Sequence, residues 1–187
     1  METNSDIDIL QLIAEEKTFD KGLRILILKY QEPLYWHIRR MVHIHQDADD
    51  VIQNTFIKVY KHIRKFKQDS KLYTWLYRIA TNESITFIQK KRKHLKISGE
   101  LNEITLMQQL KADDYFDGNE AQVKLIAAIA KLPMRQKQVF NMRYYDDLSY
   151  NEIAEILEVS VGSLKASYHH AAKKIENHLI ENVDHVG

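Results

Sequence analysis

Apolar residues recur at intervals of three or four along most of the chain, and this spacing is the strongest constraint on its fold. Between residues 47 and 66, five apolar side chains fall on one face of a helix: Ile52, Phe56, Val59, Ile63 and Phe66. The chain has only five Gly and two Pro, and it lacks the alternating Val- and Thr-rich runs of half-buried strands. We therefore expect an all-α fold.

Start and stop signals divide this pattern into separate helices. We expect helices over about residues 6–15, 20–45, 47–64, 70–94, 121–131, 133–145, 150–157 and 161–180. Pro33 is expected to end or kink the second of these, because proline has no N–H to donate within a helix. The expected N-terminal caps are Ser5 or Asp6, then Asp47, Ser70, Ser149 and Ser160, with Pro133 at a first helical position.

Charge is strongly segregated, although the net charge is only +1. Residues 61–96 carry eleven basic and two acidic side chains, whereas residues 97–121 carry six acidic side chains and one lysine. A basic segment of this kind suits a polyanion, and the acidic stretch has weak helical periodicity. We expect two small helical domains, at residues 1–94 and 120–187, joined by an acidic linker over residues 95–119.

Several classes of protein are disfavoured by what the sequence lacks. The absence of cysteine excludes disulfides, thiolate zinc sites and cysteine nucleophiles. The first residues do not resemble a signal peptide, and no run approaches the roughly 18 apolar residues of a membrane helix. We found no phosphate-binding Gly-rich loop, no His-Glu metal spacing and no nucleophile–base pair. We therefore expect a cytoplasmic protein without membrane insertion that has no catalytic residues, metal or cofactor and is not an enzyme.

Residues 150–180 have the dimensions of a helix-turn-helix, with a short helix, a three-residue turn and a longer second helix. The capping box of Ser149 and Glu152 begins the first helix. The two helices are expected to share an apolar seam formed by Ile153, Ala154 and Leu157 against Leu164, Tyr168, Ala171 and Ile175. The second helix keeps an outward stripe of donors for a major groove or its phosphates: Lys165, His169 and Lys173, flanked by Ala166 and His170. The alternative is an ordinary helical hairpin with a solvated basic face.

Aromatic and cationic side chains alternate over residues 66–78, at the start of the most basic segment. One face of the predicted helix carries Trp75, Arg78, Asn82, Thr86, Gln89 and Lys93. Aromatic faces stack on unpaired bases, an amide can read a base edge, and the cluster at residues 90–93 can neutralise phosphates. The pattern is consistent with binding to single-stranded or melted nucleic acid. It is equally consistent with core aromatics and a solvated basic helix end.

Taken together, the two halves resemble the sigma-70 family of transcription initiation factors, in its extracytoplasmic-function (ECF) group. The resemblance rests on DADDVIQNTFIKVY at 47–60, YTWLYRIATN at 73–82, and LPMRQKQVFNMRYYDDLSYNEIAEILEVSVGSLKASYHHAAKKIENHL at 132–179. It covers about residues 20–94 and 121–180. Any one of these motifs is shared more widely, since response regulators carry a similar helix-turn-helix, but the combination in this order is specific.

The resemblance implies a role for each motif. The residues implied in docking on core RNA polymerase are Asp49, Asp50, Gln53 and Asn54. Those implied in melting and reading the −10 promoter element are Phe66, Tyr73, Trp75, Arg78, Asn82, Lys90 and Arg92. Those implied at the −35 element are Ser163, Lys165, Ala166, His169, His170 and Lys173. The implied partners are core RNA polymerase and promoter DNA, with an anti-sigma factor as a further candidate, and the acidic linker would lie in the polymerase cleft.

The chain departs from the family pattern at several positions. Ala166-Ser167 replaces a frequent Ser-Arg pair, and His170 and Ala172 replace arginines, so base preferences do not transfer. Glu158 occupies a turn position where Gly is common and a left-handed backbone is expected, at a cost of about 1 kcal/mol. The main alternative function is a stand-alone helix-turn-helix DNA-binding regulator, which leaves the motifs at 47–82 unexplained.

Overall fold

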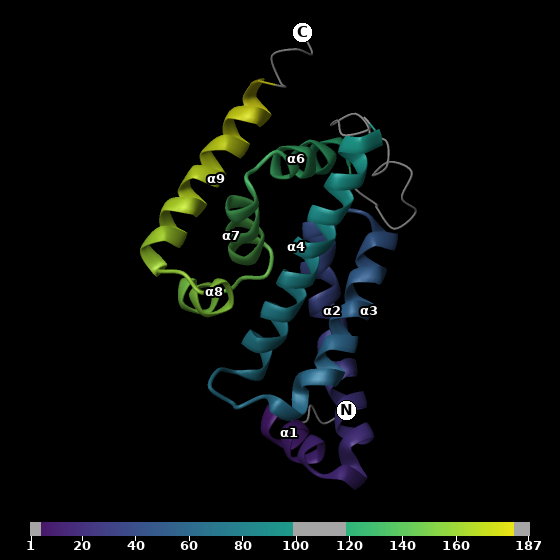
Figure 1. The fold of residues 1–187 in the computed structure, drawn as a ribbon. Helices are drawn as coiled ribbons and strands as arrows, with labels where there is room; N and C mark the ends of the chain where they lie inside the picture. Colours follow the sequence, from purple (N-terminus) through teal and green to yellow (C-terminus); the bar gives the residue numbers. More distant parts are fainter. Residues whose placement is uncertain (1–4, 99–118, 182–187) are drawn as a thin grey trace.

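The computed structural model describes residues 5–98 and 119–181, and throughout these ranges the chain forms helices and connecting turns without strands (Figure 1). The expected all-α fold is confirmed. The α-helices are α1 (Asp6–Ala14), α2 (Phe19–Val42), α3 (His45–His62), α4 (Leu72–Ser98), α6 (Glu120–Ala130), α7 (Met134–Tyr144), α8 (Tyr150–Leu157) and α9 (Val161–Glu181). Two 3₁₀ turns, at Glu16–Thr18 and Ile63–Lys65, follow α1 and α3.

Helix α1 begins at a capping box, in which the Ser5 hydroxyl accepts the Asp8 N–H and the Asp8 carboxylate accepts the Ser5 N–H. It buries Ile9 and Ile13 against α2. The close approach depends on Gly22 of α2, because a Cβ at this position would lie 2.9 Å from atoms of Ile13. A side chain at residue 22 would therefore push α1 away from its site.

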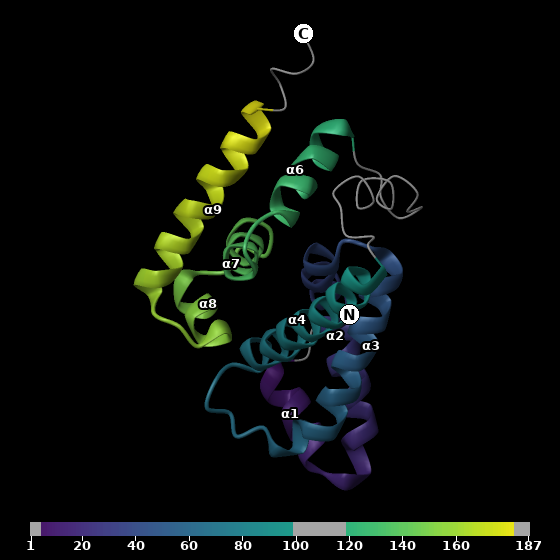
Figure 2. The same ribbon diagram turned by 45° about the horizontal axis from the view of Figure 1, so that its top comes forward.

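Helices α2, α3 and α4 pack side by side as the N-terminal bundle (Figures 1 and 2). Of the two outcomes expected at Pro33, an end or a kink, the end is wrong, because α2 continues through this proline as one helix. Tyr30 and Leu34, on either side of it, are both buried in the same core. Their packing offsets the cost of an internal proline, which is about 3 kcal/mol in an exposed helix.

The prediction that Asp47 caps α3 is wrong. Helix α3 begins at His45, and its N-cap residue, Ile44, makes no side-chain capping bond. Asp47 lies within the first turn, where a carboxylate suits the helix dipole, and it forms an ion pair with Lys91 of α4. Of the predicted apolar stripe, Val59 and Ile63 lie in the core, and Ile52, Phe56 and Phe66 are partly buried against it.

Helix α4 is longer than expected. It begins at Leu72 and continues to Ser98, so the predicted boundary at residue 94/95 lies inside this helix. The rest of the predicted acidic linker, residues 99–118, lies outside the described residues.

The C-terminal helices form a second group in which α9 packs mainly against α7 and α6. The Ser149–Glu152 capping box begins α8, and Ser160 accepts the Ser163 N–H at the start of α9, as predicted. The expected seam is only partly correct, because Leu164 lies with the residues of α8 but Ala171 and Ile175 do not. These two pack instead against α6, α7 and the turn between them, at Ala128, Ile129, Leu132 and Phe140.

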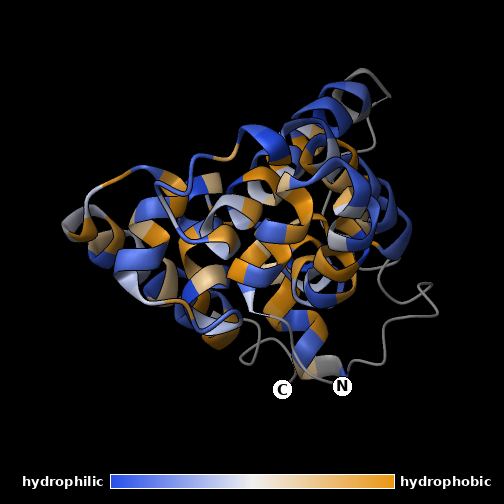
Figure 3. Cartoon of the chain, turned by 90° about the horizontal axis from the view of Figure 1, so that it is seen from below, coloured by the Kyte–Doolittle hydropathy of each residue, from blue (hydrophilic) through white to orange (hydrophobic). Residues whose placement is uncertain are grey.

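The two groups of helices are in direct contact in this structure. One hydrophobic core cluster contains Leu76 and Ala80 of α4 together with Val139 and Met142 of α7 and Ile153 of α8. Seen from below, the apolar residues face the interior between the helices (Figure 3). Among the helices of the described ranges, we found none long and apolar enough to span a membrane.

Candidate nucleic-acid and polymerase interfaces

Four polar residues of α3 stand outside the core, as predicted. Asp50, Gln53 and Asn54 are exposed, and the half-exposed Asp49 carboxylate lies 3.2 Å from His45 Nε2. Asn54 Nδ2 donates to the backbone oxygen of Asp50 at 2.8 Å. These side chains share one edge of α3 while the opposite face of the helix is buried, so they are available to a partner without unfolding the bundle.

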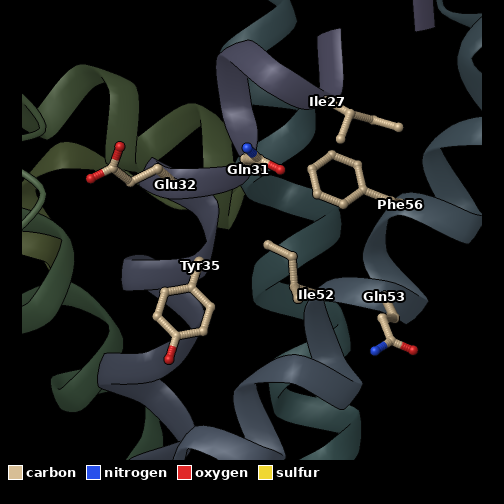
Figure 4. Close-up of a pocket in the computed structure, with 7 residues that line it drawn as sticks. All are labelled: Ile27, Gln31, Glu32, Tyr35, Ile52, Gln53 and Phe56. Atoms are coloured by element: carbon tan, nitrogen blue, oxygen red, sulfur yellow. The ribbon is translucent and has the colours of Figure 1, made fainter. Parts of the chain in front are cut away.

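A shallow groove of about 390 Å³ lies beside this polar edge, between α2 and α3 (Figure 4). Its lining residues are Ile27, Gln31, Glu32 and Tyr35 from α2 and Ile52, Gln53 and Phe56 from α3. Ile27, Ile52 and Phe56 supply apolar surface, whereas Gln31, Glu32 and Gln53 supply polar groups around it. Of the predicted polymerase-binding residues, Gln53 lines this groove. Sequence reasoning missed the contribution of α2, because these residues are distant from α3 along the chain.

The predicted −10 residues divide into an open group and a covered group. In the open group, Asn82, Lys90 and Arg92 are exposed along α4. Trp75 is half-buried, and its ring contacts that of Phe66 with 5.2 Å between centroids. Along its length α4 therefore exposes amide and cationic groups and a half-buried aromatic ring.

Tyr73 and Arg78 form the covered group and lie against the C-terminal helices. Arg78 Nη2 donates to the Glu155 backbone oxygen at 2.7 Å, and its Nη1 lies 3.0 Å from Glu158 Oε1. The Tyr73 hydroxyl is buried and has no hydrogen-bond partner among the described residues. In this arrangement the two side chains are therefore not exposed with Asn82, and their role at the −10 element stays a prediction.

A buried polar network joins the two groups of helices, and no local sequence pattern indicated it. His37 of α2 is fully buried; its Nδ1 lies 2.6 Å from Asp146 Oδ2, and its Nε2 lies 2.9 Å from Thr81 Oγ1. Arg40 Nη1 donates to the other Asp146 oxygen. Asn141 Nδ2 also donates to the Arg40 backbone oxygen at 3.0 Å. The contacts of α2 with Asn141 and Asp146 join residues that are 101 to 109 positions apart, so neither periodicity nor spacing indicated them.

A second buried pair lies at the end of α2, where Lys137 Nζ of α7 is 3.4 Å from His43 Nε2. Burial, reinforced by the charge of Arg92, lowers the pKa of Lys137 to about 8. Burial, followed by the charges of Lys137 and Arg39, holds the pKa of His43 well below its ordinary value. The pair therefore keeps an uncharged imidazole as the acceptor for the lysine.

The candidate recognition helix α9 exposes all six predicted −35 residues: Ser163, Lys165, Ala166, His169, His170 and Lys173. The turn before it takes the predicted left-handed conformation at Glu158, with φ 55° and ψ 48°. Lys165 Nζ lies 6.0 Å from the centroid of the Tyr150 ring. Among the described residues, no group of three or more His, Asp or Glu side chains is arranged to hold a metal ion.

Two family models match the chain in the order that the motifs suggested. Residues 26–94 match sigma-70 region 2, and residues 122–175 match sigma-70 region 4. The first range contains the groove and the α4 surface, and the second contains α7, α8 and most of α9.

Curated relatives match over most of their length. The chain is 33% identical over 158 residues to the ECF RNA polymerase sigma factor SigW of Bacillus subtilis, covering 80% of this chain and 84% of the relative. It is 30% identical to the RNA polymerase sigma-H factor of Pseudomonas aeruginosa, covering 90% and 92% of the two chains. The ECF RNA polymerase sigma-E factor of Escherichia coli is also 30% identical, with 89% and 92% covered.

Solved structures share the fold at lower identity. CnrH, in complex with the cytosolic domain of CnrY, is 20% identical with a TM-score of 0.69, covering 95% of this chain and 99% of that one. The sigma factor RpoE of Bartonella quintana, in complex with the anti-sigma factor NepR, is 19% identical with a TM-score of 0.67, covering 85% and 97%. The region matches and the curated relatives lead to one conclusion: the chain belongs to the ECF group of the sigma-70 family and is a transcription initiation factor that directs RNA polymerase to promoters.

Proposed function

We propose that this chain divides promoter recognition among three surfaces. The polar edge of α3 and the adjoining groove bind core RNA polymerase, the open face of α4 reads and helps to melt the −10 element, and α9 reads the −35 element. The observation that carries the proposal is the exposed polar edge beside an apolar groove. A protein that only binds duplex DNA has no use for this combination.

The groove suits a helix of the polymerase as its occupant. Helix-in-groove recognition places apolar anchors in a hydrophobic groove, and polar groups around it fix the orientation. Ile52 and Phe56 supply apolar contact area, while Asp49 and Asp50 supply negative charge at one end of the same helix. We therefore expect the polymerase surface to combine apolar side chains with basic ones.

The α4 surface suits an unpaired DNA strand. The Trp75 ring is only partly covered by Phe66, so part of it remains available to a base. Stacking of a base on an aromatic side chain contributes about 1–3 kcal/mol, and an amide such as that of Asn82 can pair with the edge of an extruded base. Lys90 and Arg92, further along the helix, would neutralise backbone phosphates.

The chain itself supplies specificity and strand opening, and nucleotidyl transfer belongs to the polymerase. Sigma factors as a class are non-enzymatic and act in the bacterial cytoplasm together with RNA polymerase. We extend both properties to this chain, and we include an anti-sigma factor among its partners because RpoE of Bartonella quintana was crystallised with NepR.

Charge reversal on α3 tests the polymerase contact. With Asp49 and Asp50 both changed to Lys, affinity for core polymerase in the absence of DNA should fall at least several-fold. Folding should change by only about 0.5 kcal/mol, since both side chains lie outside the core. A Glu176→Lys variant, which reverses an exposed charge on α9, is the matched control and should bind as the wild type does. Unchanged affinity of the α3 variant, measured by fluorescence anisotropy with labelled chain, would argue against this surface.

A further inference from the structure

We propose that the packed arrangement is a self-inhibited form of the chain, in which α8 covers part of the −10-reading face of α4 and a buried ionic latch of His37, Arg40 and Asp146 holds it closed. The inference rests on the proposed role of α4 in reading the −10 element. Figures 1 and 2 both show α8 beside the N-terminal half of α4.

The covering contacts engage groups that a DNA strand would need. Both terminal nitrogens of Arg78 are occupied, one by the Glu155 carbonyl at 2.7 Å and one by the Glu158 carboxylate at 3.0 Å. Lys71 Nζ, just before α4, lies 3.8 Å from Glu152 Oε1. The oxygens of Glu155 and Glu158 occupy sites on Arg78 that DNA phosphates would otherwise take, and Glu152 places a negative charge beside the exposed Lys71. The C-terminal helices and the −10 strand therefore compete for the same cations.

Two of the three side chains of the latch are removed from water, and Arg40 is partly exposed. His37 and Asp146 have side chains 0% and 2% exposed. The Thr81 hydroxyl donates to the Tyr77 backbone oxygen at 2.7 Å, so its oxygen is left to accept from His37 Nε2. His37 Nδ1 donates to Asp146, whose second oxygen accepts from Arg40. Asp146 therefore accepts hydrogen bonds from two side chains of α2, His37 and Arg40.

The C-terminal group contributes a single residue to this latch, Asp146. The groups that contact His37 are Tyr77 and Thr81 on α4 and Asp146, and Arg40 on its own helix reaches the same Asp146 carboxylate. Removing the Asp146 charge would leave the partly exposed Arg40 without its carboxylate partner and weaken the acceptor of the buried His37, and the open arrangement would rehydrate both side chains. The closed arrangement therefore depends on this carboxylate more than on any exposed ion pair.

The backbone conformation of Glu158 also indicates that the closed form is specifically stabilised. Its left-handed conformation is one that glycine adopts without strain and other residues adopt at a cost. A glutamate at this position gives Arg78 a carboxylate partner across the interface. The residue that departs from the family pattern is thus one that stabilises the closed form.

Promoter geometry requires the closed form to open. Elements centred near −10 and −35 are 25 base pairs apart, or roughly 85 Å along the duplex at about 3.4 Å per base pair. A compact chain of this length is only roughly 40 Å across, from its expected radius of gyration. The chain therefore cannot contact both elements at the same time while α8 lies on α4.

A pair of spin labels tests the latch directly. The chain has no cysteine, so labels on cysteines introduced at the exposed positions Asp69 and Asn151 are unambiguous. These positions flank the Lys71–Glu152 contact, so the wild type should give one short distance. Asp146→Asn should replace much of it with longer, broad distances. Asp147→Asn is the matched control, because Asp147 is 96% exposed and lies outside the latch. A short distance retained in Asp146→Asn would overturn the latch.

Binding of the −10 strand tests the self-inhibition. The probe is a fluorescein-labelled single strand that carries the non-template −10 sequence of a promoter transcribed by the holoenzyme. If about one molecule in ten is open in the wild type, Asp146→Asn should bind this probe about tenfold more tightly. Glu158→Gly should also bind more tightly although it relieves the strained backbone, so a folding defect cannot explain the gain. Opening without tighter binding would overturn the self-inhibition.

The two proposals fail in distinguishable ways. The label distances depend only on the latch and need no promoter. If α4 does not read the −10 element, Asn82→Ala in holoenzyme will open promoters as the wild type does, whatever the distances show. If the latch alone is wrong, the Asn82→Ala defect will remain while Asp146→Asn stays closed.

Discussion

Asn82 is the single side chain on which the −10 proposal depends most. It is exposed one turn beyond Arg78, and the Thr86 hydroxyl bonds to its backbone oxygen rather than to its amide. The amide is therefore available to an extruded base.

We expect Asn82→Ala to impair promoter opening more than promoter capture, at a cost of about 1–3 kcal/mol. Permanganate footprinting of the −10 region by holoenzyme should show reduced melting on duplex promoters. Asn177→Ala removes an exposed amide from α9 and is the control. Melting at the wild-type level in the Asn82 variant would contradict the assignment.

Lys137 gives the fold a pH dependence whose sign can be derived. Its pKa is about 8 in the folded chain, below the ordinary lysine value, so the unfolded chain binds more protons between these limits. The free energy of unfolding should therefore rise with pH between about 8 and 9.5. Below pH 8 Lys137 is protonated in the folded chain, so the full free-energy cost of burying its ammonium group is present.

Lys137→Met should remove this rise and add about 1–2 kcal/mol to the free energy of unfolding at pH 7, after the lost bond to His43 is counted. Urea titrations of both proteins at pH 7, 8 and 9.5 measure the effect, with the exposed Lys93→Met variant as the control. A variant that retained the wild-type slope would show that another group causes it.

At the scale of elements, the sequence predicted the helices better than their partners. The periodicity at 47–64 and the capping boxes are local properties, and they placed α3, α8 and α9 within a few residues. The prediction that Asp47 caps α3 failed because a carboxylate near the start of a helix can instead form an ion pair with another helix, here with Lys91 of α4. The groove and the contact of Asp146 with His37 were beyond reach, because each joins segments that are distant in sequence.

A separate prediction concerns the recognition helix α9, because its two exposed lysines lie at different distances from the start of the helix. Lys165, in the first turns of α9, is the better placed of the two lysines for a base edge, whereas Lys173 lies two turns later. Lys165→Ala should change which −35 sequences are preferred. Lys173→Ala should weaken all sequences alike and reduce the salt slope by about one phosphate contact.

Anisotropy titrations of the free protein on a set of −35 duplexes at several salt concentrations separate these outcomes. Unselective weakening by Lys165→Ala would show that this side chain contacts phosphate as well.

At the scale of the whole molecule, the proposal requires the chain to adopt two arrangements, one closed and one open. The closed one buries a common core and the His37–Asp146 contact. The open one has to place the α4 and α9 surfaces on elements that are roughly 85 Å apart. Binding to polymerase can supply the free energy of opening only through contacts that the closed form lacks.

Transcription by reconstituted holoenzyme tests the central claim most directly. Core polymerase is incubated with a library of genomic fragments, with and without the chain, and the 5′ ends of the transcripts are sequenced. Discrete start sites should appear only when the chain is present, should share −10 and −35 motifs, and should be lost with the Asp49→Lys, Asp50→Lys double variant. The same start sites with core polymerase alone, or start sites that are unaffected by this variant, would contradict the account.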